Sequence, residues 1–213
     1  MKKTKETILL TGITGNLGSW LAVEMLQQGK KVLALMRDQN SKDAARRLDR
    51  ILDIARGRDL KDNIEIIHGD ICKKGLGLKA NVKNVNRISK IIHCAACTKF
   101  SEDEGKSHQM MNVSGTLNVL ELAGRLSLPL VHVSSAYIAG KRTGIVKEDE
   151  IDVGQSFNNI YENTKCRSEM LVHEWAQMNS LPLVILRPSI VLGDSQYGKT
   201  VHFTSLYDYT AYD

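Results

Sequence analysis

The chain has 213 residues, of which 42% are hydrophobic and 25% are charged, the composition of an ordinary globular protein large enough to bury a core. Its formal net charge of +5 is spread along the sequence, and only three Phe residues accompany the basic side chains, so a nucleic-acid-binding surface is not expected. No apolar run reaches the roughly 18 residues of a membrane span. The apolar run after the basic residues 1–6 is too short for a signal peptide, and we therefore expect a cytoplasmic protein.

The first predicted strand, residues 8–10, leads directly into a glycine-rich stretch at residues 11–18. Apolar residues then recur at helical spacing, so strand, glycine turn and helix follow one another as a phosphate-binding turn requires. The N–H groups at the start of such a helix favour an anion. The spacing, Gly-x-x-Gly-x-x-Gly, differs from the Gly-x-Gly-x-x-Gly of many dehydrogenases. The residues that we expect to bind a dinucleotide diphosphate are Gly12, Thr14, Gly15, Asn16, Leu17 and Gly18.

The end of the second predicted strand, residues 31–36, bears on which nicotinamide cofactor can bind. A carboxylate there would accept from the adenosine ribose 2′-OH of NAD, whereas Arg37 can pair with the 2′-phosphate of NADP through its forked donors. Met36 carries no carboxylate, although Asp38 follows Arg37. The pattern favours NADP over NAD, and a solvated strand-end charge is the alternative role for Arg37.

Two further strand ends supply candidates for cofactor binding. The strands are predicted at residues 64–67 and 90–94. The carboxylate after the first could accept from an adenine amino group or serve only as a turn residue, and the alanines after the second are small enough for close backbone approach to a ribose or nicotinamide. The candidates are Asp70, Ile71, Ala95 and Ala96.

The four cysteines, at positions 72, 94, 97 and 166, do not predict a metal site. Cys94 and Cys97 form a Cys-x-x-Cys pair, which is a redox motif or half of a zinc site in other proteins. Cys94, however, continues an apolar strand, and no second Cys or His pair follows at zinc spacing. Reduced thiols are therefore expected.

The rest of the chain continues to alternate, with helices and strands predicted at residues 107–126, 130–133, 161–180 and 183–187. Asn112 lies on the first of these helices and is a candidate polar group. Ser134 and Ser135 end the first of these strands, and residues 139–160 form a long loop of the kind that is commonly functional. The alternation over the whole chain predicts an α/β fold with a doubly wound parallel sheet.

Tyr161 and Lys165 lie four residues apart on a predicted helix, so their side chains share one face. A free phenol titrates near pH 10, and a neighbouring ammonium stabilises the phenolate. Bringing the pKa of Tyr161 close to neutral would need roughly three units, or about 4 kcal/mol, which a cofactor-lined cleft can supply. An exposed pair at chance spacing is the alternative. The position of the pair behind the glycine turn and the serine pair favours acid/base catalysis.

Seven segments together resemble the extended short-chain dehydrogenase/reductase family. In chain order they are residues 11–18, 69–71, 93–96, 112–116, 133–137, 161–165 and 186–193. The stretches at 94–100 and 187–195 are most similar to the thioester-reductase and fatty acyl-CoA reductase branch. The resemblance implies a Rossmann fold with the strand order 3-2-1-4-5-6.

The resemblance also implies roles for the candidate catalytic residues. Tyr161 would be the general acid/base at the substrate oxygen, and Lys165 would lower its pKa while hydrogen-bonding the nicotinamide ribose. Ser135, in preference to Ser134, would hydrogen-bond the reacting carbonyl, and Asn112 would belong to the polar network of the active site. Two residues complete the expected cofactor-binding set, Pro188 and Ile190.

The expected domain organisation is an NAD(P)-binding Rossmann domain at residues 1–198 and a short tail at 199–213. Extended members of the family continue with a smaller domain that closes over the substrate, and the tail would be a remnant of it. A longer gene product or an oligomer partner, such as a second copy in a homodimer, would then complete the substrate site.

The leading hypothesis is an NADP-dependent oxidoreductase that transfers a hydride to a carbonyl or acyl-thioester substrate, the thioester being on coenzyme A or a carrier protein. A nucleotide-sugar epimerase or dehydratase with bound NAD is the enzymatic alternative, against which Arg37 counts. A non-catalytic NAD(P)-binding sensor is a third hypothesis, although binding alone does not need a tyrosine whose pKa is lowered. A serine hydrolase is disfavoured because the serine pair lacks a Gly-x-Ser-x-Gly elbow.

Overall fold

A computed structural model of the chain describes residues 6–37, 41–78, 85–98 and 105–202. Within these residues, six parallel strands form one sheet in the order β3-β2-β1-β4-β5-β6. The strands are β1 (Thr7–Thr11), β2 (Lys31–Met36), β3 (Ile64–His68), β4 (Lys90–His93), β5 (Leu130–Val133) and β6 (Leu183–Leu186). The predicted strand order and the doubly wound Rossmann fold are thereby confirmed.

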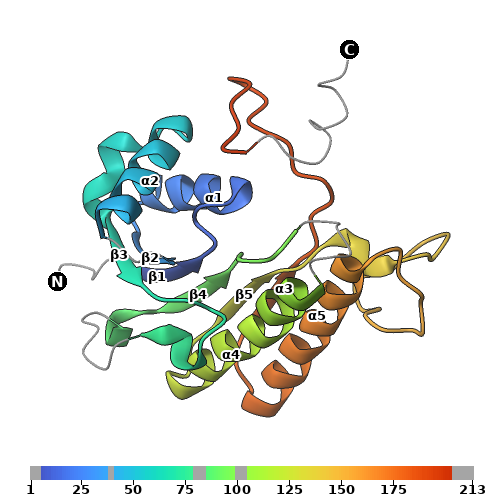
Figure 1. The fold of residues 1–213 in the computed structure, drawn as a ribbon. Coiled ribbons are helices and arrows are strands. Elements are labelled where there is room, and N and C mark those ends of the chain that lie inside the picture. Colours follow the sequence, from blue (N-terminus) through green and yellow to red (C-terminus); the bar gives the residue numbers. More distant parts are fainter. Residues whose placement is uncertain (1–5, 38–40, 79–84, 99–104, 203–213) are drawn as a thin grey trace.

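Helices cover both faces of the sheet (Figure 1). One face packs against α1 (Asn16–Gln27) and α2 (Ser41–Ile54), and the other against α4 (Gly115–Arg125) and α5 (Ile160–Asn179). In β1, Ile8 and Leu10 belong to the first hydrophobic core, while Leu9 belongs to the second. Because both faces are covered, β1 reads in the sequence as a continuous apolar run.

The helix predicted at residues 107–126 is divided into three parts. It consists of α3 (Gly105–His108), the π-helical segment η5 (Gln109–Ser114) and α4. Asn112 lies in η5, and its amide hydrogen-bonds the backbone of Cys97 and the side chain of Thr164. A π-helical turn inside a helix often marks a functional site, and here it accompanies an inward-facing amide.

Short 3₁₀ turns connect the larger elements, namely η1 (Arg58–Asn63), η2 (Lys74–Gly77), η3 (Val85–Arg87) and η6 (Ala136–Ala139). The last of them follows β5 and carries the chain away from the serine pair. Among the described residues, no helix combines the length and the apolarity that crossing a bilayer demands.

Two buried histidines lie side by side on β4 and β5, with ring centroids 5.5 Å apart. Thr11 Oγ1 accepts from the N–H groups of residues 94 and 95 and therefore donates to His93 Nδ1, at 2.8 Å. His93 Nε2 then donates to Thr116 Oγ1, at 3.0 Å. Neither ring nitrogen of His132 has a partner among the described residues. Burial lowers the pKa of His93 to about 3 and also lowers the pKa of His132, so both rings are neutral.

Mild acid should destabilise this fold through the two histidines. In the unfolded chain each imidazole takes up a proton below about pH 6.5, whereas in the folded chain neither does, so stability that is present above pH 6.5 is lost as the pH falls. We expect the free energy of unfolding to fall by roughly 2 kcal/mol between pH 6.5 and 5.5, measured by urea denaturation. His132→Phe should halve the loss and His173→Gln, at an exposed position, should not change it. An equal loss in wild type and His132→Phe would contradict the assignment.

Candidate active site

A cavity of about 1330 Å³ lies along the carboxyl edge of the sheet, and most of the residues predicted for the site line it. Parallel strands end at this edge, so the turns that follow β1, β2, β3, β4 and β5 all reach the same opening. The predicted residues in the lining are Gly12, Thr14, Gly15, Asn16, Leu17, Gly18, Arg37, Asp70, Ile71, Ala95, Ala96, Ser135, Tyr161, Lys165, Pro188 and Ile190. Asn112 is the one predicted residue outside it.

The glycine turn between β1 and α1 is tightly packed against its surroundings. Gly12 has φ +79°, and a Cβ there would lie 2.6 Å from the backbone nitrogen of Ala95. A Cβ at Gly18 would lie 2.1 Å from the carbonyl oxygen of Gly12. Gly15 is the N-cap of α1, and no side chain caps this helix. The first-turn N–H groups of α1 therefore lack a side-chain acceptor at the cavity, which fits an anionic diphosphate.

The Asn16 side chain lines the cavity and also hydrogen-bonds other segments of the protein. Its Nδ2 donates to the carbonyl oxygen of Leu192, at 3.1 Å, and its Oδ1 accepts from Thr200 Oγ1, at 3.1 Å. Next to these contacts, His202 Nε2 donates to the carbonyl oxygen of Thr14, at 2.8 Å. The chain after β6 is thus tied across the glycine turn, a contact between distant segments that local sequence patterns do not encode.

Two arginines line the end of the cavity that lies beside β2. Arg37 follows β2 and Arg47 lies on α2, and both side chains are exposed. Sequence reasoning assigned a role to Arg37 and missed Arg47, which stood in a basic cluster on the helix. The available signal was its position two turns into the helix that follows Arg37, which brings it back over the strand end. Asp70 Oδ1 accepts from the N–H of Cys72, at 2.9 Å, and so also serves the turn after β3.

The start of α5 is fixed by reciprocal capping, which sets the position of Tyr161. The Oδ1 of Asn159, the N-cap, accepts from the N–H of Glu162, at 2.9 Å. Glu162 Oε2 in turn accepts from the N–H of Asn158, at 2.8 Å. This arrangement satisfies N–H groups that the helix itself cannot pair, and it places Tyr161 in the first turn at the cavity wall.

Tyr161, Lys165 and Ser135 all line the cavity. Burial raises the pKa of the Tyr161 phenol, and a hydrogen bond with Ser135 offsets part of this increase. Lys165 Nζ donates to the carbonyl oxygen of Val133, at 2.7 Å, and burial lowers its pKa to about 8. The pKa of Tyr161 therefore differs in direction from the sequence-based expectation, because burial outweighs the other influences and the ammonium is directed at a backbone oxygen.

Asn112 is buried behind the cavity wall and supports it. Its Oδ1 accepts from the N–H of Cys97, at 2.7 Å, and its Nδ2 donates to the Cys97 carbonyl, at 3.0 Å, and to Thr164 Oγ1, at 3.1 Å. It thus holds the segment after β4 against α5, next to Tyr161. Asn112 therefore contacts the protein around the cavity and does not line the cavity itself.

None of the four cysteines forms a disulfide. Burial raises the pKa of Cys94 and of Cys166 to about 11, so both are protonated at neutral pH. The described part of the chain contains no group of three or more His, Cys, Asp or Glu side chains that could hold a metal ion.

The fold, the uncapped helix start and the cavity along the sheet edge define an NAD(P)-binding Rossmann protein of the extended short-chain dehydrogenase/reductase type. More closely, the chain belongs to the family described as Male sterility protein, whose model matches residues 10–212. Several relatives are reductases by name, among them carboxylic acid reductases and fatty acyl-CoA reductases, so the resemblance to the thioester-reductase and fatty acyl-CoA reductase branch is confirmed.

Three relatives are longer than this chain, and the chain matches only part of each. It is 30% identical to a carboxylic acid reductase of Segniliparus rugosus, over 90% of this chain and 18% of the relative. It is 28% identical to fatty acyl-CoA reductase 1 of Arabidopsis thaliana, over 87% of this chain and 51% of the relative. The crystal structure of the terminal R domain from the myxalamid PKS-NRPS biosynthetic pathway is 31% identical with a TM-score of 0.82, over 92% of this chain and 51% of that one. The chain thus covers at most about half of each.

Proposed function

We propose that the chain is the cofactor-binding part of an NADP-dependent reductase that delivers a hydride to a carbonyl or acyl-thioester substrate. The observation that carries this proposal is the single cavity that reaches from the glycine turn to Ser135, Tyr161 and Lys165. The names of the relatives, carboxylic acid reductase and fatty acyl-CoA reductase, support this substrate class. We assign residues 1–198 to the cofactor-binding domain; of the tail at 199–213, residues 203–213 lie outside the described part.

The residues of the chain would hold the cofactor and handle the proton. Bound in the cavity, NADPH would supply the hydride. The first-turn N–H groups of α1 would bind its diphosphate, and Arg37 with Arg47 its 2′-phosphate. Ser135 and Tyr161 would donate hydrogen bonds to the substrate oxygen, and Tyr161 would give up its proton as negative charge develops there. Lys165, mostly charged at pH 7 with a pKa of about 8, would stabilise the resulting phenolate.

The substrate would be an acyl thioester, on coenzyme A or on a carrier protein. A fatty acyl-CoA reductase among the relatives supports the first form, and the terminal R domain of a PKS-NRPS pathway supports the second. In either form the thioester carbonyl would present its oxygen to the Ser135 and Tyr161 hydroxyls, which both line the cavity.

The test is NADPH oxidation by the purified protein with acyl-CoA, aldehyde and ketone substrates, run on this chain and on any longer product of its gene. We expect oxidation that depends on the acyl-CoA or the aldehyde. Tight NADPH binding with no oxidation by either protein would contradict a reductase and favour the sensor. Preference for NAD over NADP in binding would favour an epimerase or dehydratase.

Replacing both cavity-lining arginines should change the choice of cofactor. For Arg37→Gln/Arg47→Gln we expect the Kd of NADPH to rise roughly 10–100-fold, because charged hydrogen bonds to the 2′-phosphate are lost, while the Kd of NADH changes little. Fluorescence titration measures both constants. Arg46→Gln is the matched control, since the Arg46 guanidinium pairs with Asp43 at 2.5 Å on the same helix. An equal loss of NADPH and NADH affinity would rule out a role in 2′-phosphate recognition.

A further inference from the structure

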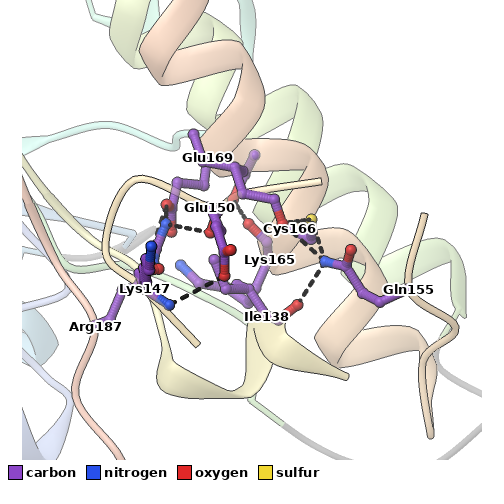
Figure 2. A network of polar contacts seen from close by, with 10 residues as sticks. Ile138, Lys147, Glu150, Gln155, Lys165, Cys166, Glu169 and Arg187 are labelled. Atoms are coloured by element: carbon purple, nitrogen blue, oxygen red, sulfur yellow. Dashed lines mark hydrogen bonds and ion pairs between the residues drawn. The ribbon is translucent and has the colours of Figure 1, made fainter. Parts of the chain in front are cut away.

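A buried ion pair joins the helix of Lys165 to the strand segment that lines the cavity. Glu169, one helical turn after Lys165, has an exposed fraction of 0%. Its Oε1 accepts from Arg187 Nε, at 3.0 Å, and from Arg187 Nη2, at 2.6 Å (Figure 2). Arg187 directly follows β6 and directly precedes Pro188, which lines the cavity. The pair therefore fixes α5 to the segment after β6, whose next residue lines the cavity.

Arg187 also holds the long loop between η6 and α5. Its Nη1 donates to the carbonyl oxygen of Lys147, at 3.2 Å, and its Nη2 to that of Glu150, at 3.1 Å (Figure 2). The Glu150 carboxylate pairs with Arg142 at 2.5 Å, which closes the loop on itself. One guanidinium thus connects a helix, a strand end and a loop.

The same loop is attached to the turn that follows the serine pair. Gln155 Nε2 donates to the carbonyl oxygen of Ile138 in η6, at 2.9 Å, and to that of Ile151, at 2.8 Å. Ser135 is the N-cap of η6, and its Oγ accepts from the N–H of Tyr137, at 3.2 Å. A displacement of the loop would therefore reach the serine that faces Tyr161.

Glu169 and Arg187 also contribute to the charge around the Lys165 ammonium. On α5 the groups near Lys165 are Tyr161 and Glu169; on β4 they are His93 and Cys94, and on β5 His132. Both histidines are neutral, and the phenol and thiol are protonated at pH 7, so Glu169 is the charged neighbour. Burial lowers the pKa of Lys165, and Cys94 followed by the Glu169 carboxylate raises it. Because the Cys94 thiol has a pKa of about 11, it is still protonated where Lys165 titrates, and the carboxylate is the negative charge that acts there. Arg187 neutralises that carboxylate.

We propose that Glu169 and Arg187 are a positioning pair that aligns Lys165 with the serine and tyrosine hydroxyls and balances the charge beside the buried ammonium. Its effect on turnover rests on the reductase function proposed above. Its effect on Lys165 does not, because the ammonium titrates in the protein without cofactor or substrate. The two are therefore separable by experiment.

The test follows the Lys165 ammonium by NMR of the protein labelled at the lysine ε-carbon, without cofactor, across pH 6–10. Glu169→Gln keeps the shape of the side chain and its acceptor for Arg187 but removes the charge, and we expect the pKa of Lys165 to fall by roughly one unit. Arg187→Met leaves the carboxylate uncompensated, and we expect an increase of similar size. The double variant should return toward wild type. Arg167→Gln, at an exposed position on the same helix, is the control.

A purely structural role predicts a different pattern. In that case the variants would lose thermal stability while the pKa of Lys165 stayed within about 0.2 units of wild type, a result that would overturn the proposal. If Arg187→Met fails to fold, Glu169→Gln and Arg187→Lys decide the question, since Arg187→Lys should keep the Lys165 titration of the wild type.

In active protein, Glu169→Gln should lower kcat and shift the basic limb of the pH profile, with the NADPH Kd changed less than about threefold. A wild type without turnover would refute the reductase, whereas an unmoved Lys165 would refute the positioning pair.

Discussion

Replacing Tyr161 with Phe is expected to lower kcat for NADPH-dependent reduction by about 10²–10⁴-fold, the usual contribution of a positioned general acid. The substitution removes one oxygen from a side chain that is 9% exposed and keeps the ring that packs beside His108. Because burial raises the pKa of the phenol, Tyr161 is protonated at neutral pH and ready to donate to a substrate oxygen. Losing it leaves Ser135 as the remaining hydroxyl of the predicted set at that oxygen.

The measurement is single-turnover NADPH oxidation, with the Kd for NADPH determined separately by fluorescence. We expect the Kd to stay within about threefold of wild type, since the phenol acts on the substrate. Tyr197→Phe is the matched control, because Tyr197 is 54% exposed, packs its ring on Arg56 and is not among the residues that line the cavity. Wild-type turnover in Tyr161→Phe would remove the catalytic assignment, whatever happened to cofactor binding.

Position along the chain was sufficient to predict many of the residues that share the cavity. Parallel strands put their carboxyl ends at one edge, so the residues after each strand, from Gly12 to Ser135, had to meet once the order of strands and helices was correct. Tyr161 joins them because its helix starts at the same edge. Ala95 could be placed at the cavity from its position after a strand, and Pro188 from the family resemblance.

The direction of each polar side chain could not be predicted in this way. Helical spacing places Tyr161 and Lys165 on one face, but it does not say that Lys165 Nζ points at the Val133 carbonyl. Asn112 lies in a π-helical segment, and its amide turns toward Cys97 because hydrogen bonds from distant segments decide the local helix. Arg47 reaches the cavity from α2, and its place among other basic residues gave no reason to choose it over them without the helical position.

Adding one methyl group at Gly18 should disrupt the site more than any other single carbon in the glycine turn. The new Cβ would lie 2.1 Å from the oxygen and 2.8 Å from the carbon of the Gly12 carbonyl, and 3.2 Å from the Cα of Ile13. These are backbone atoms, which cannot rotate away as a flexible side chain can. The start of α1 would have to move off β1, and the first-turn N–H groups would leave the place where they face the cavity.

For Gly18→Ala we therefore expect the free energy of unfolding to fall by about 3 kcal/mol, the upper end of the usual effect of overpacking, and the Kd of NADPH to rise more than about 100-fold. Urea denaturation and fluorescence titration measure the two. Gly105→Ala is the control, since it lies in α3 and no described atom lies within 4 Å of its new Cβ, so it should be neutral or stabilise by up to about 1 kcal/mol. Wild-type stability together with wild-type NADPH affinity in Gly18→Ala would mean that the turn does not hold the diphosphate against α1. Because the two variants add the same methyl group to a helix, their difference isolates the contact with the Gly12 backbone from any general effect of replacing glycine.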